Sequence, residues 1–125
     1  MRSSRKLKSL YRVYNYKYFN NQLSDSAVVR WATVEEMRKK SVMFGLDGRY
    51  YSEEEMPNGR ALILIDPSLR KRKRQMHMTI LHEMNHPFTE SERGIHGVGF
   101  EAGMLRLANM GAFKGLWLCI FESFR

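Results

Sequence analysis

The stretch from Met76 to His86 constrains the fold more than any other part of the sequence. It carries His82 and His86, and side chains four residues apart lie one above the other on a helical face. Its apolar residues recur at the spacing of an amphipathic helix, as Met76, Ile80, Leu81 and Met84. We therefore expect a helix that buries its apolar residues and presents two imidazoles together. Pro87 should end or kink this helix, because proline donates no backbone hydrogen bond.

The two histidines belong to the pattern His-Glu-x-x-His, with Glu83 directly after His82. Two imidazoles at this spacing can bind one zinc ion about 2 Å from each ring nitrogen, and the glutamate lies beside them for a water. With four histidines in the chain, roughly 0.01 such matches are expected by chance in a shuffled sequence of the same composition. The pattern predicts a zinc site on a rigid helix.

A third zinc ligand is needed, and two histidines are left to supply it. His77 lies about 140° around the helix from His82, at roughly 100° per residue, and is expected to be exposed or to have a structural partner. His96 lies in a segment with three glycines, which allow the chain to turn back towards the motif. We therefore predict His96 as the third ligand.

The rest of the chain mixes helical and strand patterns. A helix is expected from Arg5 to about Asn21, with one face that suits core packing better than stacking on bases, formed by Leu7, Leu10, Tyr11, Tyr14 and Tyr18. Strands are expected at Val28–Ala32 and Ala61–Ile65, and Thr33 with Glu36 forms a capping box.

Two further elements complete the predicted fold. Asp47-Gly48 suits a tight turn at positive φ, which predicts a hairpin between Val42–Leu46 and Arg49–Tyr51. A third helix is expected from Val98 to about Met110, followed by an apolar tail, residues 116–121, that docks on the core. The pattern indicates one α+β domain over residues 1–125. It has a small antiparallel-rich sheet of three to four strands, about three main helices and the histidine motif on the central helix.

Composition excludes several classes of protein. The chain has 125 residues, the size of a single ordinary domain. Cys119 is its only cysteine, so neither an internal disulfide nor a cysteine zinc ribbon can form. The longest apolar run, Ala61–Ile65, is too short to span a membrane, and Lys8 and Arg12 interrupt any signal peptide. We expect a cytoplasmic monomer with no membrane partner.

The chain is strongly basic, with 21 Lys and Arg against 13 Asp and Glu and a net charge of +8. A surplus of this size favours polyanionic partners. Eleven of the basic residues lie in two segments, Arg2–Lys17 and Arg70–Arg74. The second segment enters the histidine-bearing helix, where positive charge opposes the helix dipole. This placement predicts DNA binding near the zinc site.

The motifs together resemble the SprT-like metalloprotease domain, the family of Spartan and bacterial SprT proteins. The resemblance covers roughly residues 7 to 110. It rests on three parts of the sequence: His82-Glu83-x-x-His86, His96-Gly97-x-Gly99-Phe100, and the opening segment Leu10–Leu23 with the strand that follows it. It implies zinc bound by His82, His86 and His96, with Glu83 as catalytic base. The implied activity is a zinc endopeptidase, and the implied substrates are DNA-associated or DNA-crosslinked proteins.

Two other functions stay open at this point. The chain could be a non-proteolytic DNA-binding module with a structural zinc ion, or a regulatory metallopeptidase of the ImmA-like kind that cleaves one partner. For a protease, the residues able to stabilise the developing oxyanion are Tyr50, Tyr51, Arg93 and His77. An exposed edge of the strand Ala61–Ile65 would hold an extended peptide by strand addition.

Overall fold

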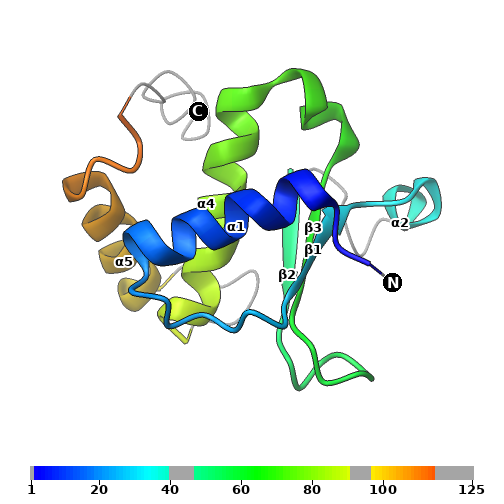
Figure 1. Ribbon diagram of the computed structural model, residues 1–125, viewed down its shortest axis with the longest axis horizontal. Coiled ribbons are helices and arrows are strands. Elements are labelled where there is room, and N and C mark those ends of the chain that lie inside the picture. Colours follow the sequence, from blue (N-terminus) through cyan, green and yellow to red (C-terminus); the bar gives the residue numbers. More distant parts are fainter. Residues whose placement is uncertain (1, 40–46, 91–96, 115–125) are drawn as a thin grey trace.

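The structure is a computed structural model that describes residues 2–39, 47–90 and 97–114. Its elements (Figure 1) follow in the order α1 (Arg5–Tyr18), β1 (Val28–Trp31), α2 (Val34–Arg38), β2 (Gly48–Tyr51), β3 (Leu62–Ile65), the 3-10 helix η1 (Pro67–Lys71), α4 (Lys73–Phe88) and α5 (Val98–Asn109). The α+β class and the three long helices confirm the prediction. Within the described ranges, no helix is long and apolar enough to cross a membrane.

The three described strands form one mixed sheet in the order β1-β3-β2. Strand β1 runs parallel to β3, with Val29 opposite Ile63, and β2 runs antiparallel to β3, with Tyr50 opposite Ile63. Among the described residues the sheet is therefore mixed, with one parallel and one antiparallel pairing. The expected exposed edge on Ala61–Ile65 is wrong, because β3 is paired on both sides. All four residues of β3 are buried, as is typical of a central strand.

The N-terminal segment ties itself to the outer edge of β1. Ser4 N donates a hydrogen bond to Val29 O at 2.9 Å, and Val29 N donates to Ser3 Oγ at 3.0 Å. On the other side, no strand of the described ranges pairs with the outer edge of β2. The N-terminal segment therefore covers the edge at β1, whereas the strand at the other edge, β2, contacts α4.

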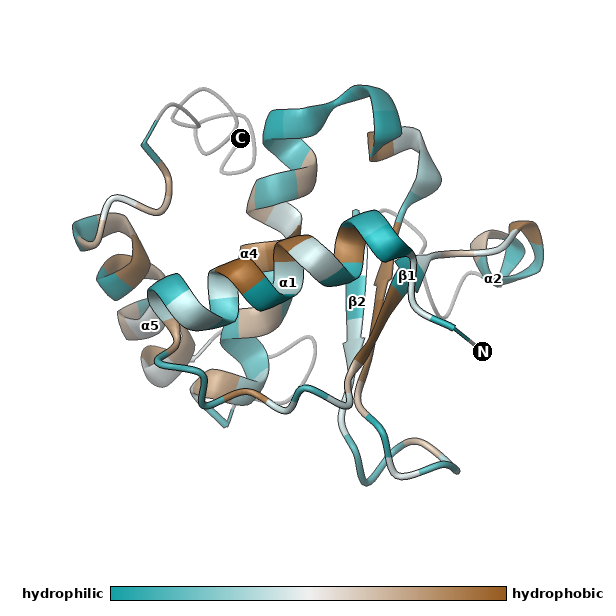
Figure 2. Cartoon of the chain, in the orientation of Figure 1, coloured by the Kyte–Doolittle hydropathy of each residue, from teal (hydrophilic) through white to brown (hydrophobic). Residues whose placement is uncertain are grey.

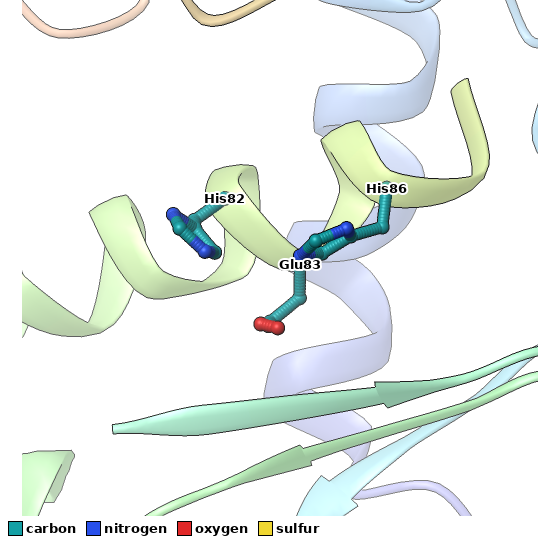
Figure 3. Close-up of side chains that lie close together, drawn as sticks. All are labelled: His82, Glu83 and His86. Atoms are coloured by element: carbon teal, nitrogen blue, oxygen red, sulfur yellow. The ribbon is translucent and has the colours of Figure 1, made fainter. Parts of the chain in front are cut away.

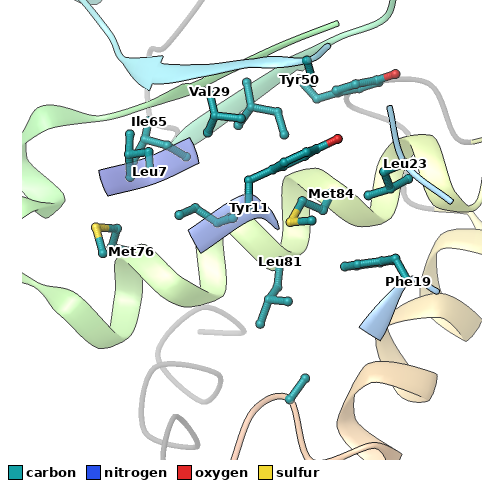
Figure 4. Packing of buried hydrophobic residues seen from close by; sticks show 14 of the residues in the cluster. Leu7, Tyr11, Phe19, Leu23, Val29, Tyr50, Ile65, Met76, Leu81 and Met84 are labelled. Carbon is teal, nitrogen blue, oxygen red and sulfur yellow. The ribbon is translucent and has the colours of Figure 1, made fainter. Parts of the chain in front are cut away.

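The main core lies between one face of the sheet and the helices α1 and α4. Figure 4 shows Leu7 and Tyr11 of α1 meeting Val29 of the sheet and Met84 of α4. This confirms that the apolar face of α1 packs inward. Alternate strand residues form a second, smaller cluster on the other face, where Met37 of α2 packs against it. Figure 2 shows hydrophobic colour on the strands beside β2, hydrophilic to pale colour on β2, and alternating hydrophobic and hydrophilic bands along α1.

Helix α1 ends at Tyr18, three residues before the expected end. Asn20 and Asn21 follow with φ of 53° and 57°, the left-handed conformation that asparagine tolerates better than most residues. The buried side chain of Asn15 closes the turn. Its Nδ2 donates to Leu23 O at 2.9 Å, and its Oδ1 accepts from Leu23 N at 3.1 Å. Both halves of this amide therefore have partners, far from the histidines of α4.

Gly48 has a different role from the one predicted for it. It is the first residue of β2, opposite Ile65, and its φ is not positive. A Cβ at this position would lie 2.6 Å from Thr79 Cγ2 and 3.2 Å from Glu83 Cγ. Glycine is required here because β2 passes closely against α4. Residues 42–46 of the predicted hairpin and the tail at 116–121 lie outside the described residues.

Helix α2 begins with the predicted capping box, formed by Thr33 and Glu36. Glu36 also accepts two hydrogen bonds from Arg30 of β1, at 2.7 and 2.8 Å. These bonds lower the pKa of Glu36 to about 2, although partial burial opposes the shift. The pair fastens α2 to the sheet.

We expect Glu36→Gln to lower the free energy of unfolding at pH 7 by about 1–3 kcal/mol, because glutamine keeps the capping box but loses the charged pair. A carboxyl whose pKa is lowered on folding stabilises above its unfolded pKa and loses that effect as the pH falls. The difference from wild type should therefore shrink between pH 4.5 and pH 2. Urea unfolding at pH 7 and pH 3 measures it, and an equal difference at both values would contradict the charged pair as its cause.

Candidate metal centre

Helix α4 carries the predicted motif, and the buried apolar residues of the helix hold it against the rest of the protein. Met76, Ile80, Leu81 and Met84 are almost completely buried against the sheet, α1 and α5. Asp66 caps the N-terminus of η1, the short helix that precedes α4, because its side chain accepts a hydrogen bond from Ser68 N. The helix runs through Pro87 and ends one residue later, at Phe88. The helix therefore continues through Pro87 rather than ending at it, although its end lies close to the expected position.

Three of the four predicted site residues lie together on α4. The potential ligand atoms of His82, Glu83 and His86 all lie within 4.8 Å of one another. His82 is half-buried, whereas His86 and Glu83 are 1% and 5% exposed. The two imidazole rings are 5.5 Å apart and inclined at 74°. Figure 3 shows both rings beside the helix and the carboxylate of Glu83 projecting towards the sheet.

This donor set fits a zinc ion. Two nitrogens bound to one zinc ion at about 2.0–2.1 Å lie roughly 3–4 Å from each other. Ligand atoms within 4.8 Å reach that separation by small side-chain rotations. Neutral imidazoles are common zinc ligands, and a neighbouring carboxylate adds negative charge. His96, the predicted third ligand, lies outside the described residues.

Glu83 points into the narrow space between α4 and β2. Gly48 makes this space, because a side chain there would collide with Glu83 and Thr79. Burial raises the pKa of Glu83 to about 8, and the positive charge of Arg49 partly opposes the shift. A bound cation would also favour the ionised carboxylate. The carboxylate is therefore held in a dry position next to the two imidazoles.

Aromatic rings surround the histidines. Tyr50 of β2 is stacked on His86 at 6.1 Å, with the rings 4° from parallel. Phe100, in the first turn of α5, contacts His82 at 4.9 Å and His86 at 4.5 Å. These contacts limit the orientations available to both imidazoles.

The other sequence candidates fall in different places. His77 bonds through Nδ1 to the hydroxyl of Tyr14 in α1, which confirms that it has a structural partner. Burial, followed by the charges of Lys6 and Lys73, lowers the pKa of His77. Tyr51 packs on the opposite face of the sheet from α4. Arg93 lies outside the described residues.

The basic residues of the two segments differ in their contacts. Lys8 donates to Asp25 O at 2.6 Å, and Arg12 pairs with the Asp25 carboxylate at 3.0 Å. The basic segment Arg70–Arg74 is exposed throughout and runs from the end of η1 into the start of α4, which is hydrophilic in Figure 2. Arg70 lies over the Trp31 ring at 5.0 Å. Lys6 and Lys73 both act on His77, so the two basic segments meet there.

Two residues that shape this centre do not stand out in the sequence. Gly48 suits a turn when only its neighbours are considered, and Asn85 occupies one of the variable positions of the motif. Asn85 is completely buried on α4. In the sequence, Asn85 could be noticed only as a single amide within an otherwise apolar helical pattern.

Comparison with known proteins places the chain in a family. No curated protein and no solved structure matches it at a significant level. The model of the SprT-like family matches residues 7–116, which include most of α1, all of α4 and every residue of the centre described above. This family is associated with metalloprotease activity. The chain therefore belongs to the SprT-like family.

Proposed function

We propose that this chain is a zinc-dependent endopeptidase. The observation that carries the proposal is the buried carboxylate of Glu83 beside two imidazoles, with all three groups within 4.8 Å on one helix. His82 and His86 would hold the zinc ion, and His96 is the proposed third ligand. A zinc ion held in this way supplies a Lewis acid that polarises a peptide carbonyl and acidifies water.

Glu83 performs the proton transfers in this proposal. Its carboxylate oxygen takes a proton from the attacking water and returns it to the amide nitrogen as the peptide bond breaks. The close passage of β2 at Gly48 excludes bulk water from one side of the carboxylate, which lies within 4.8 Å of a ring nitrogen of each histidine. The dry surroundings strengthen each electrostatic interaction made there.

The outer edge of β2 is the proposed docking site for substrate. Strand β2 contacts α4 directly, so a peptide bound along this edge would lie beside the metal centre. An extended peptide that added to this edge would bind through its backbone, so cleavage would depend on exposed, unfolded chain more than on side-chain identity. This edge replaces the one expected on β3.

Metal analysis combined with a cleavage assay tests the proposed function. The purified chain should contain about one zinc ion per molecule and cleave casein, and His82→Ala should lose both properties. A chelator should abolish cleavage, and added zinc should restore it. Bound zinc without cleavage of any protein would favour a structural zinc site. Cleavage of one partner protein only, independent of DNA, would favour a regulatory peptidase.

We further propose that the substrates are bound to DNA, because the exposed basic segment Arg70–Arg74 leads into the helix of the metal centre. Duplex binding should weaken steeply with salt. Arg72→Gln/Arg74→Gln should reduce the slope of log affinity against log salt by about 0.9 for each phosphate that the arginines neutralise. Arg12→Gln, which removes one charge from the other basic segment, should change the slope less, since Arg12 already pairs with Asp25. No binding at low salt would remove this part of the proposal.

A further inference from the structure

Asn85 lies between the two histidines of α4 and is 0% exposed. Burying an amide costs free energy unless the amide is hydrogen-bonded, so a polar residue at this position calls for a reason. Leucine or methionine, as at Leu81 and Met84, would satisfy the packing of the same helix. The contacts of Asn85 show what the amide does instead.

The amide of Asn85 fastens the start of α5 onto α4. Its Nδ2 donates to Phe100 O at 2.9 Å. Gly103, one turn further along α5, leaves the space that the amide fills, because a Cβ there would overlap Asn85 Oδ1 and lie 2.6 Å from Thr89 Cγ2. Thr89 Oγ1 in turn donates to Asn85 O at 2.8 Å. The hydrogen bond from the amide to Phe100 O and the fit against Gly103 therefore fix the two helices in one register, while the Thr89 bond lies within the end of α4.

Phe100, whose carbonyl accepts the bond from Asn85, contacts both histidines. The Phe100 ring lies 4.9 Å from the ring of His82 and 4.5 Å from that of His86. A shift of the first turn of α5 would move this ring and open other orientations to both imidazoles. The bond from Asn85 to the Phe100 carbonyl thus acts on the histidines through the backbone that carries the ring.

We propose that Asn85 is a positioning residue of the metal centre. It holds Phe100 against His82 and His86, and so orders the imidazoles before a metal ion binds. The inference rests on the proposed zinc site. Ordering of this kind raises metal affinity because less side-chain freedom is lost on binding.

Zinc affinity of Asn85→Ala, measured by chelator competition, tests the inference. The dissociation constant should rise about tenfold, the lower end of the range for residues that support metal ligands. Absorption of the Co²⁺-substituted variant should also change, because it reports the geometry of the donors. Asn15→Ala is the matched control, since Asn15 is a buried amide with two partners on another helix. It removes two hydrogen bonds, so it should lower the melting temperature at least as much, and it should leave zinc affinity and the Co²⁺ spectrum as in wild type.

Phe100→Leu gives a second test that does not remove the amide. It keeps the carbonyl that accepts from Asn85 but removes the ring, so it should weaken zinc binding by a similar factor. Because both changes act through one contact, the double variant should bind zinc no more weakly than either single variant. Multiplied effects, or wild-type zinc affinity in Asn85→Ala, would overturn the inference and leave the zinc site standing. A wild-type chain that binds no zinc would instead overturn the proposed function, and this inference with it.

Discussion

Glu83→Gln should lower the rate of casein cleavage by about 10²–10⁴-fold, the usual contribution of a positioned general base. Glutamine has nearly the same size as glutamate, so it fits the narrow space beside Gly48. It cannot take a proton from water at neutral pH. Zinc content should remain close to that of wild type, because the proposed ligands are histidines. Loss of cleavage with retained zinc would separate the base from the ligands.

Glu101→Gln is the control for this change in charge. Glu101 lies in the first turn of α5, the helix that packs on α4, but its side chain is exposed. The control variant should cleave casein at the wild-type rate. If Glu83→Gln also cleaved at that rate, Glu83 could not be the base, and the proposed hydrolytic mechanism would have to be abandoned.

Gly48→Ala should lower the free energy of unfolding by about 1–3 kcal/mol, because it forces an extra methyl group into a packed interface. The added carbon would lie 2.6 Å from Thr79 Cγ2, so β2 and α4 must move apart. The shift would also displace Glu83, which lies 3.2 Å from the same point. Cleavage should therefore fall together with stability, as measured by casein assay and urea unfolding.

Thr79→Ser should rescue Gly48→Ala. Serine removes the methyl group that causes the collision and keeps the hydroxyl that donates to Gln75 O at 2.8 Å. Gly99→Ala, in an exposed part of α5 with nothing within 4 Å of the new carbon, is the control and should not destabilise the chain. A double variant no more stable than Gly48→Ala alone would show that the collision with Thr79 is not the cause.

Local patterns are sufficient to predict most of the fold. The apolar spacing in α1 and α4 indicates their buried faces, and the capping box indicates the start of α2. The same local logic brings His82, Glu83 and His86 together, because a helix sets the distance between residues three or four apart. Each of these inferences needs only residues within one or two turns of each other.

The errors concern residues whose role depends on distant parts of the chain. Gly48 suits a turn by its neighbour Asp47, but its requirement comes from Thr79, which is 31 residues away. The place of β3 in the sheet depends on two strands pairing with it, and the run Leu62–Ile65 alone does not show how many neighbours it has. Asn85 likewise depends on Phe100 and Gly103 in the next helix. Such pairings emerge only when the elements pack.

The bonds from Ser3 and Ser4 to Val29 also bear on how the protein can be engineered. They hold the N-terminal segment at the outer edge of β1, and β3 separates this edge from β2. A purification tag or fusion partner attached before Ser3 would therefore emerge on the side of the sheet away from β2. Deleting the two serines would remove these hydrogen bonds and expose the outer backbone groups of β1, and an unpaired strand edge of this kind is expected to promote aggregation.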